Sequence, residues 1–157
     1  MKKLHIDMDL LLELSSEDTK GEGESYLNIE SGDFSYIPLN VLNAIEDSSK
    51  LFELEEWEKE LIQEAQDIND DPEKYLYIST IDEEFILSIM KEYILSVNDI
   101  NLREKLHNSL NDGNYSHLFN SVLIKYGDID SFYDFKDYKC NDYLEKWLLK
   151  NGIEIAK

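Results

Sequence analysis

The feature that most constrains the fold is a run of apolar residues at helical spacing between residues 82 and 97. Its apolar side chains recur at steps of three and four: Phe85, Ile86, Ile89, Met90, Tyr93, Ile94 and Val97. Because an α-helix completes a turn in 3.6 residues, these side chains fall on one face. Asp82 precedes the run and can accept hydrogen bonds from the free N–H groups of the first turn. The pattern predicts a central amphipathic helix that begins after Asp82.

A second local signal predicts a β-hairpin over residues 26–37. Two β-prone runs flank a Ser-Gly-Asp turn, in which Gly32 can supply the positive φ angle that the turn needs. Side chains alternate across a strand, so Leu27 and Ile29 share the face suited to a core, while Tyr26 lies on the other. The two strands are predicted at residues 26–30 and 33–37, and a third short strand at residues 75–80.

Helical patterns account for most of the remaining chain. Further helices are predicted at residues 7–18, 54–68, 100–111 and 114–127, and a last one whose stripe is Tyr143, Leu144, Trp147 and Leu148. The predicted helix 54–68 places Trp57, Leu61, Ile62, Ala65 and Ile68 on its apolar stripe. Residues 19–25 are expected to form a loop. No Pro/Gly/Ser linker divides the chain, so we expect a single domain over residues 1–157. The fold class is predicted to be α+β, a small antiparallel sheet around the hairpin covered by five or six helices.

Charge and composition narrow the classes of function. The 157 residues carry a net charge of −20, which repels nucleic-acid backbones and anionic bilayers, so we expect no direct binding to nucleic acid or membrane. No apolar run is long enough to span a bilayer, and acidic residues interrupt the N-terminal segment where a signal peptide needs apolar ones. We therefore expect a cytoplasmic protein. Cys140 is the only cysteine, and the few histidines are scattered, so neither a disulfide nor a metal or other cofactor is expected.

The negative charge is concentrated in one segment, residues 46–73, which we call the acidic tract. It contains 12 acidic side chains and only 2 lysines. One interpretation is a solvated helix face in an acidic protein; the other is a surface that resembles a nucleic acid and binds a basic protein. The predicted partner-binding carboxylates are Glu53, Glu55, Glu56, Glu60 and Glu64.

A block of aromatic residues near the C-terminus, residues 131–152, suggests a further contact point. The residues at helical spacing after Tyr143 are expected to pack in the core. Four aromatic residues precede the predicted helix and cannot all point inward, so some are expected at the surface, where aromatic side chains often anchor protein contacts. Phe132 and Tyr133 are the predicted contacts.

No catalytic set can be assembled from the sequence. Calcium-loop spacing fails at the segments that begin at Asp67 and Asp128, because neither has the glycine and the glutamate that such a loop requires. The leading hypothesis is therefore a non-enzymatic module that binds another protein. The alternatives are a small enzyme or nucleotide-responsive domain with a cleft near Tyr115, His117 and Tyr133, and a regulatory module whose partner is encoded nearby.

The order of these signals resembles a known family. The hairpin YLNIESGDFSYI, the helix after YLYIST, and the block from LREKLHNSLN to the final Trp-Leu before Asn-Gly are together similar to the bacterial uncharacterised protein family 0158. The resemblance covers residues 25–153 and implies an α+β domain without an established activity. The chain departs from the family at residues 114–119, Asn-Tyr-Ser-His-Leu-Phe, where the family is usually basic, so a role of those positive charges is not implied here.

Overall fold

The computed structural model describes residues 1–16 and 21–157. Its described residues divide into two compact units. Unit 1 comprises Met1–Ile81 and Leu144–Lys157, and unit 2 comprises Asp82–Tyr143. The α+β class is confirmed, with eight α-helices among the described residues together with a three-stranded antiparallel sheet and a parallel strand pair. The prediction of a single domain stays a prediction.

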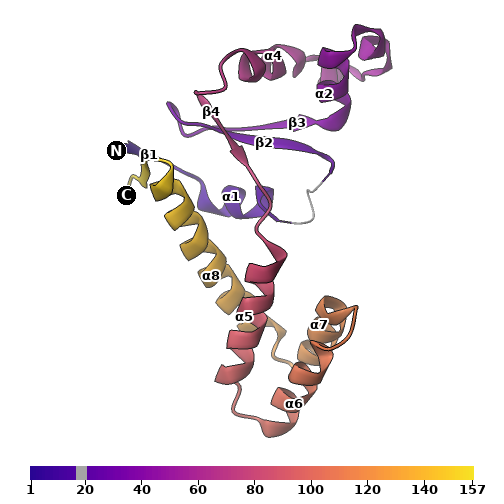
Figure 1. Cartoon of the computed structure of the whole chain (residues 1–157), viewed down its shortest axis with the longest axis vertical. Helices are drawn as coiled ribbons and strands as arrows, with labels where there is room; N and C mark the ends of the chain where they lie inside the picture. The colour runs from indigo at the N-terminus through magenta and orange to yellow at the C-terminus, as the bar shows by residue number, and fades with distance from the viewer. Residues whose placement is uncertain (17–20) are drawn as a thin grey trace. The chain divides into compact units, whose positions relative to one another are not determined.

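The antiparallel sheet of unit 1 is built on the predicted hairpin. Strand β2 (Gly23–Asn28) lies at its centre, between β3 (Phe34–Pro38) and β4 (Tyr75–Ile78) (Figure 1). Ser25 pairs with Tyr36 on one side and with Ile78 on the other. Leu27 is fully buried, and Tyr26 on the other face is half-buried and packs against the core formed by Ile37 and its neighbours, so the expectation that only the Leu27 face lies on a core is wrong.

The strand boundaries differ from the prediction because of the turn. Asn28 ends β2, since its side-chain oxygen accepts hydrogen bonds from the N–H groups of Glu30 and Ser31 and so begins the turn two residues early. Gly32 has the expected positive φ, 82°, and is buried. At the other end β2 begins at Gly23, so the predicted loop 19–25 is wrong for residues 23–25, while residues 19 and 20 lie outside the described part.

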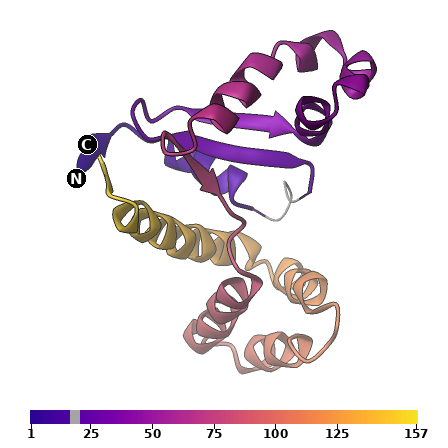
Figure 2. The ribbon, with the colours of Figure 1, turned by 45° about the horizontal axis from the view of Figure 1, so that its top comes forward.

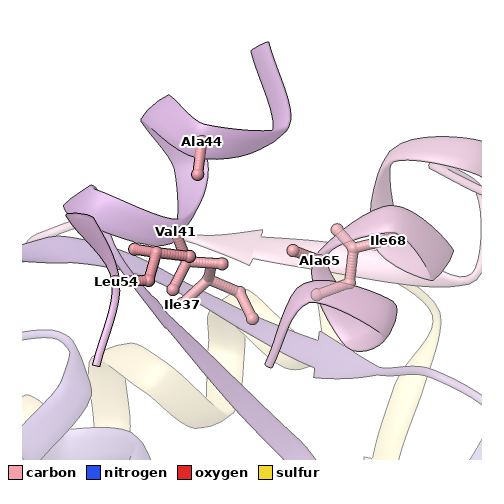
Figure 3. Packing of buried hydrophobic residues seen from close by; sticks show 6 residues of the cluster. All are labelled: Ile37, Val41, Ala44, Leu54, Ala65 and Ile68. Atoms are coloured by element: carbon pink, nitrogen blue, oxygen red, sulfur yellow. The ribbon is translucent and has the colours of Figure 1, made fainter. Parts of the chain in front are cut away.

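Four helical segments follow the hairpin and cover one face of the sheet. They are α2 (Leu39–Glu46), the 3-10 helix η2 (Ser48–Glu53), α3 (Glu56–Lys59) and α4 (Ile62–Asp70). Figure 2 shows α2 and α4 on the same side of the sheet. Figure 3 shows the core between them, formed by Ile37, Val41, Ala44, Leu54, Ala65 and Ile68.

The predicted helix 54–68 is wrong as one continuous element. Residues 60 and 61 form a turn that separates α3 from α4. In α3 the buried side chain is Glu58, which is 5% exposed, whereas its neighbour Trp57 is 54% exposed. The expectation that Trp57 lies on the core stripe is therefore wrong, because Leu54 and Glu58 take the inward positions.

The two ends of the chain complete unit 1. Strand β1 (Lys2–Leu4) pairs in parallel with β5 (Ile153–Ile155), and α1 (Met8–Leu14) follows β1. Asp7 accepts a hydrogen bond from the N–H of Leu10 and thereby caps α1. The predicted helix 7–18 is shorter in the structure, ending at Leu14, and its residues 17 and 18 lie outside the described part.

Unit 2 is helical in its described elements: α5 (Glu83–Ser96), α6 (Ile100–Ser109), α7 (Tyr115–Lys125) and the first part of α8 (Ile129–Lys150). The predicted helix after Asp82 is confirmed, and the Asp82 carboxylate accepts a hydrogen bond from the N–H of Glu84. Ile89, Met90, Tyr93 and Ile94 are buried on its predicted face.

The last helix begins earlier than the sequence analysis predicts. Helix α8 starts at Ile129, so the aromatic residues of 132–138 lie within it rather than before it. The rings of Phe132 and Phe135 are three residues apart and both contact the ring of Tyr93, with centroids 5.2 Å and 5.5 Å away. These contacts continue the apolar stripe of the helix backwards, because residues i and i+3 share one helix face.

Candidate functional site

The acidic tract packs apolar side chains against the core of unit 1 and exposes carboxylates to solvent. Its apolar residues Leu54, Ala65 and Ile68 pack inward against β3 and α2 (Figure 3). Its glutamates at 53, 55, 56 and 60 are exposed. Leu54, which lies between η2 and α3, and Ala65 and Ile68 of α4 therefore anchor the segment that carries these carboxylates.

Glu64, the fifth predicted contact, has a partner inside unit 1. It lies on α4, is half-buried, and accepts a hydrogen bond from the hydroxyl of Ser35 on β3. This contact links α4 to the sheet. The structure therefore brings Glu53, Glu55, Glu56 and Glu60 to solvent and assigns Glu64 an intramolecular contact.

Two other acidic residues of the tract shape its local structure. The hydroxyl and N–H of Ser49 both donate to Asp47, and these hydrogen bonds hold the pKa of Asp47 below its usual range. Asp47 thus caps η2. The buried carboxylate of Glu58 accepts a hydrogen bond of 3.0 Å from the N–H of Glu55, at the start of α3.

Two exposed aromatic residues lie within the acidic tract, and neither was expected at the surface from the sequence. Phe52 is 92% exposed at the end of η2, and Trp57 is 54% exposed on α3. The indole N–H of Trp57 donates a hydrogen bond to the Glu55 carboxylate. Acidic residues flank Trp57 on both sides in the sequence, and this signal favoured an exposed position over a core stripe.

The predicted aromatic contact at the C-terminus is only partly at the surface. Phe132 is 1% exposed, and its ring lies edge-on to Phe119 with centroids 5.0 Å apart. The expectation that Phe132 anchors a partner is therefore wrong, because its side chain fills the core of unit 2. Tyr133 points outward and is 43% exposed.

The residues of the alternative, enzymatic hypothesis do not line the cleft found between α5 and α6. The Tyr115 hydroxyl donates a hydrogen bond to the Glu83 carboxylate, and His117 is exposed on α7. The cleft has a volume of about 630 Å³ and is lined by Leu87, Lys91, Glu92, Ile94, Leu95, His107, Leu110 and Asn111. Glu92 there forms a salt bridge of 2.8 Å with Lys139.

The described residues also bear on metals, thiols and membranes. Within residues 1–16 and 21–157, no three His, Cys, Asp or Glu side chains are grouped so that they could hold a metal ion. Cys140 is buried, and this burial raises the pKa of its thiol. None of the described helices combines the length and apolar character that crossing a membrane requires.

The structure is that of an α+β protein whose unit 1 carries the acidic tract, with exposed carboxylates and two exposed aromatic residues in it. A family model described as Uncharacterised protein family (UPF0158) matches residues 4–157. The chain belongs to this family. The match extends the resemblance found in residues 25–153 to nearly the whole chain. Searches against curated proteins and against solved structures gave no match.

Proposed function

We propose that this protein is a non-enzymatic acidic module that binds a basic protein through the acidic tract. The observation that carries the proposal is the outward position of Glu53, Glu55, Glu56 and Glu60 on a segment whose other side is packed into the core of unit 1. A binding surface held in place before the partner arrives loses less conformational entropy on association.

The charge balance of the tract supports a basic partner. Among the described residues, one salt bridge involves the tract, the 3.4 Å contact between Lys59 and Glu56, and both side chains are well exposed to solvent. An exposed pair of this kind contributes little attraction. The field of the 12 acidic side chains is therefore available to steer a positively charged protein toward this face, and such steering weakens as salt screens it.

The partner we propose is a protein, located with this chain in the cytoplasm. A net charge of −20 opposes the approach of nucleic acids, and a tract of closely spaced carboxylates resembles the charge pattern of a nucleic acid instead. A protein that normally binds nucleic acid would therefore find its preferred charge pattern here. Tyr133 on α8 is a second, separate contact candidate in unit 2.

Affinity capture with the full chain tests this proposal. In one variant Glu53, Glu55, Glu56 and Glu60 are each changed to Gln, which removes the charge and keeps the size of each side chain. A matched control changes the exposed Glu84, Glu104, Asp134 and Glu145 to the corresponding amides, so its net charge is identical. The proteins retained from a cell lysate are identified by mass spectrometry, and the dissociation constant of the main one is measured after purification.

We expect the retained protein to be basic and to be released at about 0.5 M salt, where the screening length falls below 5 Å or so. The tract variant should lose it, and the control variant should retain it. Equal binding by both variants, or binding that persists at high salt, would contradict the proposal, because neither result depends on the position of the tract charges.

A further inference from the structure

The exposed aromatic residues of the acidic tract need an explanation of their own. Neighbouring apolar residues of the tract, Leu54 and Ala65, reach the core, whereas Phe52 and Trp57 remain outside with exposed fractions of 92% and 54%. Aromatic side chains of this size are the ones that protein interfaces use as anchors. Carboxylates alone would serve a purely electrostatic contact, so the two rings indicate that the contact has a non-electrostatic component.

The surroundings of Trp57 restrict what its ring can bind. Its N–H, the only hydrogen-bond donor of the indole, is already donated to Glu55. A partner therefore meets the face of the ring rather than its polar edge. The ring face carries the negative side of the indole quadrupole and attracts cations.

Within residues 1–16 and 21–157, no cation–π contact involves the Trp57 ring. Among the described residues, the lysines placed over aromatic rings are Lys74 over Tyr75, Lys105 over Tyr126 and Lys139 over Phe135. Lys59, two residues from Trp57, contacts Glu56 instead. In the described structure the Trp57 face is thus left to a cation from another molecule.

We propose that Trp57 and Glu55 together bind an arginine side chain of the basic partner. This inference rests on the proposed function and names the chemistry that its surface recognises. A guanidinium group can stack on an indole while an N–H group at its edge donates to a neighbouring carboxylate, whereas the ammonium group of lysine is compact and strongly hydrated and has no flat face to stack. Charge complementarity supplies the remaining attraction, from Glu53, Glu56 and Glu60.

Two peptides of equal length and equal charge, an arginine homopeptide and a lysine homopeptide, serve as the probes. Each carries a fluorophore, and its dissociation constant for the full chain is measured by fluorescence anisotropy at low salt. Wild type is compared with Trp57→Leu, Trp57→Phe, Glu55→Gln and the tract variant described above, and the measurement is repeated at about 0.5 M salt. Tyr138→Leu is the matched control, because Tyr138 is exposed on α8 in unit 2 and its loss leaves the charge unchanged. Far-UV circular dichroism verifies that each variant is folded.

We expect wild type to bind the arginine peptide more tightly than the lysine peptide. Trp57→Leu should raise the dissociation constant of the arginine peptide by about 2-fold to 30-fold, the range of a cation–π contact. The loss should be much smaller for the lysine peptide, so that the preference disappears. Trp57→Phe should retain part of it, Glu55→Gln should reduce it, and Tyr138→Leu should leave it unchanged. The comparison of two peptides across one substitution isolates the contact from general charge attraction.

The possible failures are distinguishable. If both peptides bind in a salt-sensitive manner that requires the tract carboxylates but is indifferent to Trp57, the arginine inference is overturned and the proposed function stands. If neither peptide binds, or if the tract carboxylates make no difference, the proposed function fails and the inference fails with it.

Discussion

Replacement of Phe132 by Ala should destabilise unit 2 strongly, while replacement of its neighbour Tyr133 should not. Phe132 is 1% exposed and contacts the rings of Phe119 and Tyr93 at 5.0 Å and 5.2 Å. Truncating a buried Phe to Ala removes its apolar area and leaves a cavity, which costs about 3–5 kcal/mol. Tyr133 is 43% exposed, so its truncation should cost no more than about 1 kcal/mol.

Urea denaturation followed by circular dichroism at the helix band measures both effects. With a denaturant slope of about 1–3 kcal/mol per molar, Phe132→Ala should lower the midpoint of the unit 2 transition by about 2 M, or abolish the transition if the variant does not fold. Phe132→Leu keeps an apolar side chain that fills more of the site than Ala does, so it should cost less than Phe132→Ala and provides a folded variant for comparison. Similar midpoint shifts for Phe132→Ala and Tyr133→Ala would refute the assignment of one side chain to the core and the other to solvent.

The same experiment tests the prediction of a single domain over residues 1–157. Both tryptophans, Trp57 and Trp147, belong to unit 1, so tryptophan fluorescence follows unit 1 while Phe132→Ala perturbs unit 2. If the chain unfolds in one cooperative transition, the fluorescence midpoint should shift together with the circular dichroism midpoint. Separate midpoints would show two domains.

The remaining predictions concern the hairpin and a buried tyrosine. Gly32→Ala places a Cβ atom 2.6 Å from a backbone carbonyl oxygen at a φ of 82°, so it should lower the free energy of unfolding, measured by urea denaturation, by about 2–4 kcal/mol. Gly152→Ala is the control, because Gly152 has a φ of 78° but open space around it, and it should cost only the backbone strain of about 1–2 kcal/mol. Equal losses of stability would show that the close approach at Gly32 is unimportant. Burial first, and then the hydrogen bond to Asp128, raise the pKa of Tyr93; its contribution to stability is therefore complete below the unfolded pKa of about 10 and declines as the pH rises above it. In thermal melts at increasing alkaline pH, Tyr93→Phe should lose stability less steeply with pH than wild type. Tyr138→Phe, which changes an exposed tyrosine, should behave like wild type. Identical pH dependence of stability in wild type and Tyr93→Phe would exclude this role of Tyr93.

The local sequence predicted those elements whose own residues carry a complete signal. The helix after Asp82 has both a cap and a long apolar stripe, and it forms as predicted. The hairpin has its turn glycine, and Gly32 takes the expected positive φ. The acidic tract could likewise be located by counting charges, because charge does not depend on the fold.

Tertiary packing decided which side chain of an adjacent pair faces inward. Hydrophobicity alone would place Trp57 inside and Glu58 outside, but in the structure Glu58 is buried and Trp57 is exposed. A helix of only four residues, such as α3, is oriented by the elements around it rather than by its own apolar stripe. Phe132 and Tyr133 are adjacent aromatic residues that the sequence does not distinguish. Phe132 is the one in the core because its ring packs against Tyr93 and Phe119.

The sequence by itself thus determined the fold class, the two strongest elements and the place of the negative charge, because each of these depends on residues close together along the chain. The structure alone decided where α8 begins, that α3 and α4 are separate, and that Phe52 and Trp57 remain at the surface. These features depend on contacts between residues far apart in the sequence, whose pairing no local pattern specifies.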